Sequence, residues 1–314
     1  MPIDPQIHQL LQKIGKRMTD LGHPPISQLT PEQSRYFHRE ARKMFLKQRE
    51  GEVTVTNKNI HRKIHPDLPV RIYHPIQKET HLPILVYFHG GGWVFGDLDS
   101  TDDICSFLAK VAKCIVVSVQ YRLAPENKYP LPFIDAVDAV KWTYQNGDVF
   151  GGDVNRIAIG GESSGANLAA AAAIKIRDSY DINLLSQLLI TPVTNYGFNT
   201  SSYCEGFAYS LSKETLIWFW NHYLENEEQG KEIYASPLQV INAENLPPAL
   251  IITAELDPLR DDGFLFAEKL KSSGVDVEYI CYEGFVHSFV HMIHIVERAM
   301  LVMHEIALRF RKML

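Results

Sequence analysis

The segment IAIGGESSGANL, at residues 157–168, decides the fold class that this sequence predicts. Its first three residues are apolar, as in a buried strand, and its last residues open an alanine-rich stretch that predicts a helix. Between them lies Gly-x-Ser-x-Gly, in which Ser163 is flanked by Gly161 and Gly165. A sharp turn from strand into helix crowds these two flanking positions, so only glycine fits there. We predict that Ser163 projects its hydroxyl at a helix N-terminus, where backbone N–H groups favour developing negative charge.

A second glycine-rich segment, HGGGW at residues 89–93, directly follows an apolar run at residues 84–88. Consecutive glycines allow backbone N–H groups to turn toward a small negatively charged atom without a side chain in the way. A phosphate-binding loop does not fit, because no Gly-Lys-Ser/Thr follows. We predict an oxyanion hole, with the N–H of Ser164 as its other wall, and we expect His89 to brace the loop by hydrogen bonding.

An acidic residue and a histidine come later in the chain, in the order that this chemistry requires. ELDPLRD, residues 255–261, and VHSF, residues 286–289, each follow an apolar run that predicts a strand. The order serine, aspartate, histidine is that of the α/β-hydrolase arrangement. A serine hydroxyl is a poor nucleophile at neutral pH, so an imidazole must take its proton and a carboxylate must fix the imidazole tautomer. We predict Ser163 as nucleophile, His287 as general base and Asp257 as the acid that orients it.

Three other carboxylates compete with Asp257 for the acid role, namely Glu255, Asp261 and Asp262. For Asp261 and Asp262 the alternative is capping of a helix that begins near Gly263.

Three histidines, His287, His291 and His294, have a spacing that imitates a set of metal ligands. No nearby cysteine or acidic residue completes the set, and the predicted triad already uses His287. We therefore predict no metal site and no cofactor.

Short apolar runs alternate with helical stretches along most of the chain, which predicts an α/β fold with a mainly parallel sheet. Strands are expected at residues 84–88, 115–119, 157–159, 188–190, 250–252 and 277–280. Two earlier strands are expected at residues 60–64 and 70–73, joined around Pro66 and Asp67. Helices are expected at residues 167–176, 264–271 and 295–310. Ligands bind such sheets at the carboxyl ends of the strands.

Two segments predict a helical cap over the site. In the first fifty residues, Ile7, Leu10, Leu11 and Ile14 recur at helical spacing, and Thr30-Pro31-Glu32-Gln33 reads as a helix start. Residues 195–229 are aromatic and show no strand pattern, and an ordinary crossover helix is the alternative. We predict residues 1–50 and the insertion at 195–229 as the cap, and residues 51–314 as the catalytic domain. Within the insertion, Trp218-Phe219-Trp220 favours a core position over a binding wall.

The bulk composition limits the partners and the location. The chain has 314 residues and a net charge of −6, which argues against nucleic acid and anionic membrane as partners. It has no unbroken run of eighteen apolar residues and no signal-peptide core at its start, so no membrane span is expected. Four cysteines lie far apart without metal-like spacing, namely Cys105, Cys114, Cys204 and Cys281. They predict buried free thiols in a reducing compartment, and hence a cytoplasmic location.

Taken together, the motifs resemble the hormone-sensitive-lipase-like, bacterial class IV carboxylesterase family of the α/β-hydrolase superfamily. The resemblance covers roughly residues 70–310, with motifs at residues 89–93, 121–126, 161–168, 257–261 and 286–289. It implies a central, mostly parallel eight-stranded sheet flanked by helices, with a helical cap. It also implies the triad Ser163, Asp257 and His287, and an oxyanion hole from the N–H groups of Gly90, Gly91 and Ser164.

The sequence departs from the family pattern at positions that remove no catalytic group. The elbow usually reads Gly-Asp-Ser-Ala-Gly-Gly, whereas Glu162, Ser164 and Ala166 stand here, and Ser288 stands where the family often has glycine. The motif at residues 121–126 shows no catalytic chemistry, so we expect Arg122 and Glu126 to satisfy buried loop groups.

Three functions are consistent with these residues. The first is hydrolysis of short- to medium-chain carboxylic esters, with a small-molecule ester as partner. The second is another acyl hydrolysis on the same fold, by an amidase, formamidase or lactonase. The third is a non-catalytic small-molecule-binding protein, and such proteins tend to lose a triad member, whereas all three members are present here. A homodimer through an exposed edge strand is also consistent with the sequence.

Overall fold

The strands of this chain lie in one sheet. A computed structural model describes residues 2–45, 53–76, 80–205 and 209–314, and orders the eight strands β1-β2-β4-β3-β5-β6-β7-β8. Only β2 runs antiparallel to its neighbours, β1 and β4, and the pairs from β4 to β8 are parallel. The strands are β1 (Val53–Ile60), β2 (Leu68–Pro75), β3 (Leu82–Phe88), β4 (Ile115–Val119), β5 (Gly152–Glu162), β6 (Leu184–Ile190), β7 (Ala249–Leu256) and β8 (Val277–Val286). The predicted α/β class with a mostly parallel sheet is confirmed.

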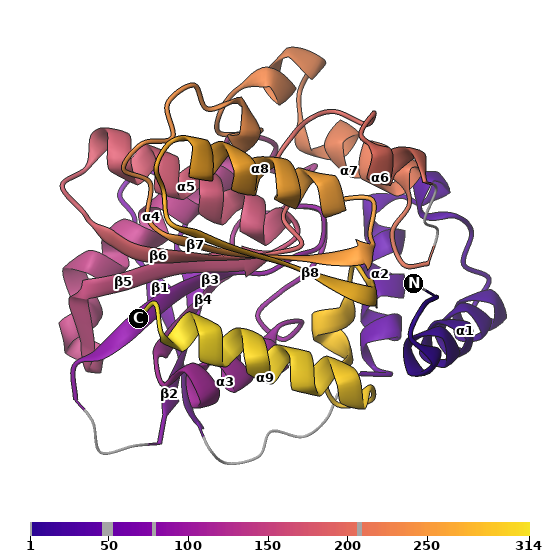
Figure 1. Ribbon diagram of the computed structural model, residues 1–314, viewed down its shortest axis with the longest axis horizontal. Coiled ribbons are helices and arrows are strands. Elements are labelled where there is room, and N and C mark those ends of the chain that lie inside the picture. The colour runs from indigo at the N-terminus through magenta and orange to yellow at the C-terminus, as the bar shows by residue number, and fades with distance from the viewer. Residues whose placement is uncertain (1, 46–52, 77–79, 206–208) are drawn as a thin grey trace.

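Helices cover both faces of the sheet. Their bounds are α1 (Pro5–Asp20), α2 (Pro31–Arg42), α3 (Asp102–Ala112), α4 (Leu131–Asn146), α5 (Ser164–Ser179), α6 (Ser201–Cys204), α7 (Lys213–Tyr223), α8 (Arg260–Ser272) and α9 (Glu297–Arg311). Short 3₁₀ segments are η1 (Ile26–Gln28), η2 (Gly147–Phe150), η3 (Glu227–Lys231), η4 (Pro237–Gln239) and η5 (Phe289–Met292). Figure 1 shows α4, α5 and α8 on one side of the sheet, α3 and α9 on the other, and α1, α2, α6 and α7 near the carboxyl ends of the strands.

The two faces bury separate hydrophobic cores, because successive side chains of a strand point to opposite sides. On β3, Ile84 and Val86 belong to the core under α4, α5 and α8, whereas Leu85 and Tyr87 belong to the core under α3 and α9. Strands buried on both faces carry apolar residues almost without interruption, which is why β3, β4 and β6 could be found from short apolar runs.

The start of α2 follows from its sequence. Thr30 caps the helix, with its hydroxyl accepting from the N–H of Gln33, while the Gln33 side chain accepts from the N–H of Thr30, and Pro31 is the first helical residue. This is the predicted helix start. The predicted domain boundary at residues 50 and 51, and Phe207 of the predicted insertion, lie outside the described residues.

The prediction of a strand at residues 60–64 is wrong. The strand β1 ends at Ile60, which pairs with Leu68 across an antiparallel hairpin, and residues 61–67 form the connection. Ile64 is 89% exposed, because this connection leaves the sheet and offers it no apolar surface. The last predicted helix also begins later than expected, since α9 starts at Glu297 and Ile295 lies before it.

The environments of the cysteines differ along the chain. The four cysteines are free, and Cys105 and Cys114 are buried as expected, but Cys204 is exposed and Cys281 half-buried. The expectation that all four are buried is therefore wrong. Within the described ranges, no helix is long and apolar enough to cross a bilayer.

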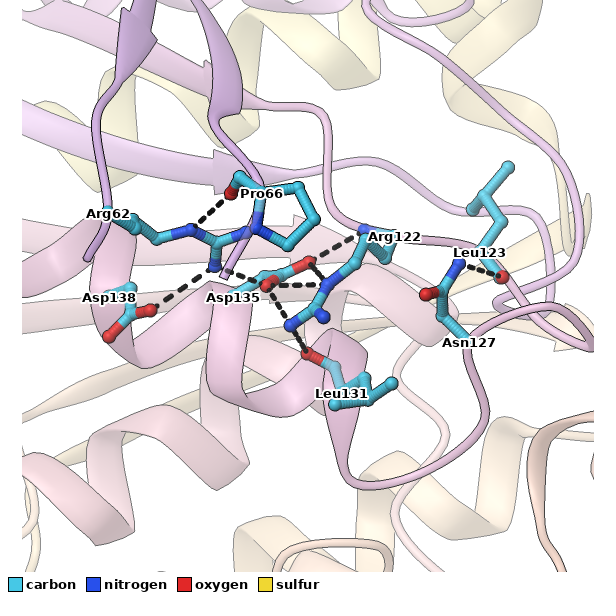
Figure 2. Close-up of polar contacts among 8 residues, drawn as sticks. All are labelled: Arg62, Pro66, Arg122, Leu123, Asn127, Leu131, Asp135 and Asp138. Atoms are coloured by element: carbon cyan, nitrogen blue, oxygen red, sulfur yellow. Dashed lines mark hydrogen bonds and ion pairs between the residues drawn. The ribbon is translucent and has the colours of Figure 1, made fainter. Parts of the chain in front are cut away.

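The loop before α4 is fixed by a buried carboxylate between two arginines (Figure 2). Asp135 is fully buried and accepts from Arg62 at 2.5 Å and from Arg122 Nη2 at 2.6 Å, and its Oδ2 also accepts from the Arg122 backbone N–H at 2.8 Å. Arg122 Nη2 also donates to the Leu131 carbonyl. The structural role expected for Arg122 is confirmed, whereas the expectation for Glu126 is wrong, because its half-exposed carboxylate pairs with Arg35 on α2.

Replacing Asp135 by alanine should lower the free energy of unfolding by about 3–5 kcal/mol, because it leaves two buried guanidinium groups without their carboxylate. Asp138→Ala is the matched control: Asp138 lies one turn along α4, is partly exposed and, in the part of the chain that the structure describes, pairs with Arg62 alone, at 3.2 Å. The control should lose at most about 1 kcal/mol. Urea unfolding followed by circular dichroism measures both, and equal losses would contradict the assigned role of Asp135.

Candidate active site

Ser163 lies in a sharp turn between β5 and α5. Its backbone has φ +56° and ψ −122°, outside the regions that a serine ordinarily adopts. A Cβ at Gly161 would lie 2.4 Å from the Phe88 carbonyl oxygen, and a Cβ at Gly165 would lie 2.0 Å from the same oxygen. The end of β3 therefore passes so close to the turn that both flanking positions must be glycine. The Ser163 N–H donates to the Ile190 carbonyl at 2.9 Å, which ties the turn to β6 as well.

The three residues of the predicted triad form one chain of hydrogen bonds. Asp257 follows β7 and His287 follows β8, and parallel neighbours bring both to the same edge of the sheet as Ser163. His287 Nδ1 lies 2.8 Å from Asp257 Oδ2, and His287 Nε2 lies 2.9 Å from Ser163 Oγ. The Leu259 N–H donates to Asp257 Oδ1 at 2.9 Å. With Nδ1–H donating to the buried carboxylate, Nε2 is the acceptor for the serine hydroxyl.

The competing carboxylates are bound elsewhere. Each accepts from backbone N–H groups: Glu255 from Gly284, Asp261 from Ser202, and Asp262 from Thr194 and Asn195. Capping of α8 by Asp261 and Asp262 is wrong as an alternative, because α8 begins already at Arg260 and these side chains hold the segment after β6 instead. Burial raises the pKa of Asp262 to about 7. Its two backbone N–H donors lower this pKa, and the neighbouring Asp257 charge raises it.

The glycine loop differs from the prediction at one donor. The Gly90 N–H donates to Glu162 Oε1 at 2.8 Å, so its single amide hydrogen is already used and it does not fit as an oxyanion donor. Gly91 has φ +118° and Gly92 has φ +58°, conformations that favour glycine. In the part of the chain that the structure describes, the N–H groups of Gly91 and Gly92 donate to no protein acceptor.

Gly91 and Ser164 therefore remain as candidate oxyanion donors, and Gly92 becomes a candidate as well. The N–H of Ser164 is the first of α5 and has no acceptor within that helix. The sequence did not reveal that Glu162 accepts a hydrogen bond from the glycine loop. This bond occupies the Gly90 N–H, so Gly92 replaces Gly90 among the candidate donors. The signal was the acidic residue directly before Ser163, in a turn where a carboxylate must find a buried donor.

His89 braces the loop, as expected. Its ring stacks on Tyr121 with centroids 4.2 Å apart, and its Nδ1 donates to the Gly90 carbonyl at 2.8 Å. The Tyr121 hydroxyl donates to the His89 carbonyl at 2.8 Å. Burial lowers the pKa of His89 to about 4, so the ring is neutral at pH 7 and stabilises the loop by its hydrogen bond.

Ser163 and His287 open into a cavity of about 390 Å³. Much of its wall is apolar and comes from the N-terminal segment, from residues 209–219 and from η5; these residues include Leu11, Ile14, Ile26, Phe45, Leu211, Leu216, Phe219 and Val290. Phe219 packs so tightly on the glycine loop that a Cβ at Gly92 would lie 2.2 Å from its ring. Trp220 is fully buried against Trp93, so the expected core position fits Trp220, whereas Phe219 lines the cavity.

The three histidines with metal-like spacing have separate partners. His287 is bound to Asp257 and Ser163, His291 Nδ1 lies 2.8 Å from Arg42 Nη1, and His294 lies 3.7 Å from Asp103. Across the described ranges no group of three or more histidine, cysteine or acidic side chains is placed to hold a metal ion.

Comparison with known proteins agrees with this architecture. A family described as having the alpha/beta hydrolase fold matches residues 85–291. Carboxylesterase NlhH of Mycobacterium tuberculosis is 40% identical over 237 residues, which is 74% of this chain and 74% of that protein. Ethyl acetate hydrolase of Pseudomonas putida is 37% identical over 236 residues, again 74% of each chain. A solved hyperthermophilic esterase from the archaeon Pyrobaculum calidifontis has a TM-score of 0.92 and 34% identity, covering 100% of this chain and 99% of that chain.

The family match spans more than half of the chain, and the relatives span about three-quarters of it at this level of identity. The chain belongs to the hormone-sensitive-lipase-like carboxylesterase family of the α/β-hydrolase superfamily.

Proposed function

We propose that this protein is a serine carboxylesterase that hydrolyses short- to medium-chain esters through an acyl-enzyme formed on Ser163. One observation carries the proposal: an unbroken hydrogen-bonded chain from Asp257 through His287 to Ser163, which ends in a largely apolar cavity. Relatives named carboxylesterase and ethyl acetate hydrolase favour ester bonds over amides and lactones as the substrate.

In the first half of the reaction, Ser163 Oγ attacks the ester carbonyl carbon while His287 Nε2 takes the hydroxyl proton. The buried Asp257 carboxylate stabilises the imidazolium that forms. The carbonyl oxygen becomes negatively charged, and we assign its donors as the N–H groups of Gly91, Gly92 and Ser164. Collapse breaks the ester C–O bond, and His287 gives its proton to the departing alkoxide, which leaves as the alcohol.

In the second half, water replaces the alcohol. His287 Nε2 takes a proton from the water as its oxygen attacks the acyl carbon of the Ser163 ester. The same donors stabilise the second oxyanion, and its collapse returns the proton to Ser163 Oγ and releases the carboxylic acid. Both halves use one base, because His287 alternates between acceptor and donor while Asp257 stays ionised.

We assign residues 1–50 and 195–229 as the cap over this site. Support comes from the cavity wall, to which α1, α2 and α7 contribute Ile14, His38 and Phe219. Three cationic residues of the N-terminal segment, Lys13, Lys16 and Arg17, are exposed, so this segment presents charge outward and an apolar face to the cavity. That arrangement favours small substrates in a closed pocket over an open lipid-binding surface.

The free cysteines and the edge strand β8 bear on the location and the assembly of the protein. The free cysteines fit a reducing compartment, from which we infer a cytoplasmic protein. The strand β8 is at an edge of the described sheet, beside β7, and we infer that it is the edge through which a homodimer would form.

Ser163→Ala should lower kcat on p-nitrophenyl butyrate by about 10³-fold or more while the fold stays intact, because only the nucleophilic oxygen is lost. Ser186→Ala is the control, since Ser186 is buried on β6 and its hydroxyl has no hydrogen-bond partner among the described residues. Circular dichroism checks the fold, and an organophosphonate should label the wild type at Ser163. Labelling of a different serine would contradict the assignment of the nucleophile.

His287→Ala should be as inactive as Ser163→Ala, because the two groups act as one unit and their losses do not add. The double variant should therefore be no slower than either single variant. EDTA should leave the wild-type rate unchanged, since no step needs a metal. Loss of activity in EDTA and its recovery with zinc would reopen the metal interpretation of the three histidines.

Catalytic efficiency on p-nitrophenyl esters should rise from acetyl to a maximum between about four and eight carbons and then fall. Each buried CH₂ contributes about 0.8 kcal/mol until the cavity is full. Phe219→Ala removes part of the wall and should move the maximum to longer chains. A steady rise to palmitoyl esters, or activation by emulsified triglyceride, would show instead that the cap is a lipase lid.

A further inference from the structure

Arg42, the last residue of α2, lies in the wall of the catalytic cavity. It is 9% exposed, and His38, one turn earlier on the same helix, lines the same cavity. The cavity wall also includes Glu162, but its two oxygens accept from the Gly90 N–H and from the Tyr87 hydroxyl, so its charge is used in the elbow. Arg42 is thus the cationic side chain of a cavity that is otherwise mostly apolar.

The hydrogen-bonding capacity of Arg42 is largely unused. A guanidinium has five N–H donors. Among the described residues it finds one acceptor, His291 Nδ1 at 2.8 Å, and its buried Nε has no partner. His291 is a neutral acceptor, because burial and the charge of Arg42 hold the pKa of its ring well below the usual range.

No carboxylate within the described ranges forms an ion pair with Arg42. The charges of Asp103, Glu162 and Asp97 raise the pKa of Arg42 without contact, and each of these carboxylates is bound to another group. Other partly buried arginines of the chain are paired: Arg35 with Glu126, Arg62 and Arg122 with Asp135, and Arg71 with Asp102. Among the described residues Arg42 has no such carboxylate, and it lines the substrate cavity.

A buried cation with unused donors is costly unless acceptors of opposite charge bind it. A carboxylate fits the two parallel donors of a guanidinium best. We propose that Arg42 binds a carboxylate carried by the substrate, so that the preferred substrates are short esters with a second, free carboxylate group. Arg42 and Ser163 line the same, mostly apolar cavity, which suits a short methylene spacer between the ester and the carboxylate. This inference rests on the proposed esterase function and narrows its substrate class.

The carboxylate can lie on either side of the scissile bond, and matched esters separate the two cases. Monoethyl glutarate carries it on the acyl side, with ethyl pentanoate as the neutral partner. 4-Acetoxybutanoate carries it on the alcohol side, with butyl acetate as the neutral partner. We expect one of the two pairs to show a higher kcat/KM for the charged member. A preference for the neutral member in both pairs overturns the proposal.

Arg42→Met should lower the ratio of charged to neutral kcat/KM in that pair by about 10- to 100-fold, because it removes a charged hydrogen-bonded partner. Arg42→Lys keeps the charge without the fork and should fall between. Arg39→Met is the matched control, since Arg39 is on the exposed face of the same helix. A role of Arg42 in folding alone would lower both efficiencies together, and an unchanged ratio overturns the proposal.

Binding without turnover separates this inference from the proposed function. Titration of glutarate into Ser163→Ala in a calorimeter should give a Kd that weakens by about 10- to 100-fold when Arg42→Met is added. Butyramide, which has the short chain but no carboxylate, should bind both proteins with the same Kd. If glutarate binding to Ser163→Ala depends on Arg42 but the wild-type protein hydrolyses no ester, the proposed function alone is overturned. Glutarate binding that is equal in both proteins overturns the carboxylate subsite alone.

Discussion

The active site depends on a backbone contact that no side chain can enter. The carbonyl oxygen of Phe88, at the end of β3, lies where a Cβ at Gly161 or Gly165 would stand. This contact brings the glycine loop, which begins one residue later, directly beside the turn that holds Ser163. The proposed nucleophile and the proposed oxyanion donors are therefore placed by main-chain atoms of two adjacent strands, and a larger residue at either glycine would separate them.

The features that could be predicted are those that local geometry imposes on the sequence. The elbow needs glycine at fixed spacing, the loop needs consecutive glycines, and parallel strands bring their carboxyl ends together, so the sequence could predict that Ser163, Asp257 and His287 lie together. The buried strands were found for a similar reason, because strands covered on both faces carry mostly apolar residues. These are constraints that act within a few residues.

What the sequence did not reveal depends on partners far away in the chain. The N–H of Gly90 was assigned to the oxyanion hole, but Glu162, 72 residues later, takes it. Asp261 and Asp262 looked like helix caps, but they hold residues about 60 positions earlier. Arg42 falls on the buried face of α2 with Ser34 and Phe37, a position that its residue type does not indicate. A residue type indicates which chemistry is available, and the fold decides where it is used.

The sheet separates the interior into two cores that share no side chains on any strand. Leu189 and Ile251 pack under α5 and α8, whereas Leu188 and Leu250 pack under α3 and α9 on the opposite face. For evolution and for engineering these are two independent packing problems. Free energies of unfolding should add for substitutions on opposite faces, and couple for substitutions on the same face. The core under α9 can therefore be rebuilt for stability while the core behind the elbow helix α5 keeps the geometry of Ser163.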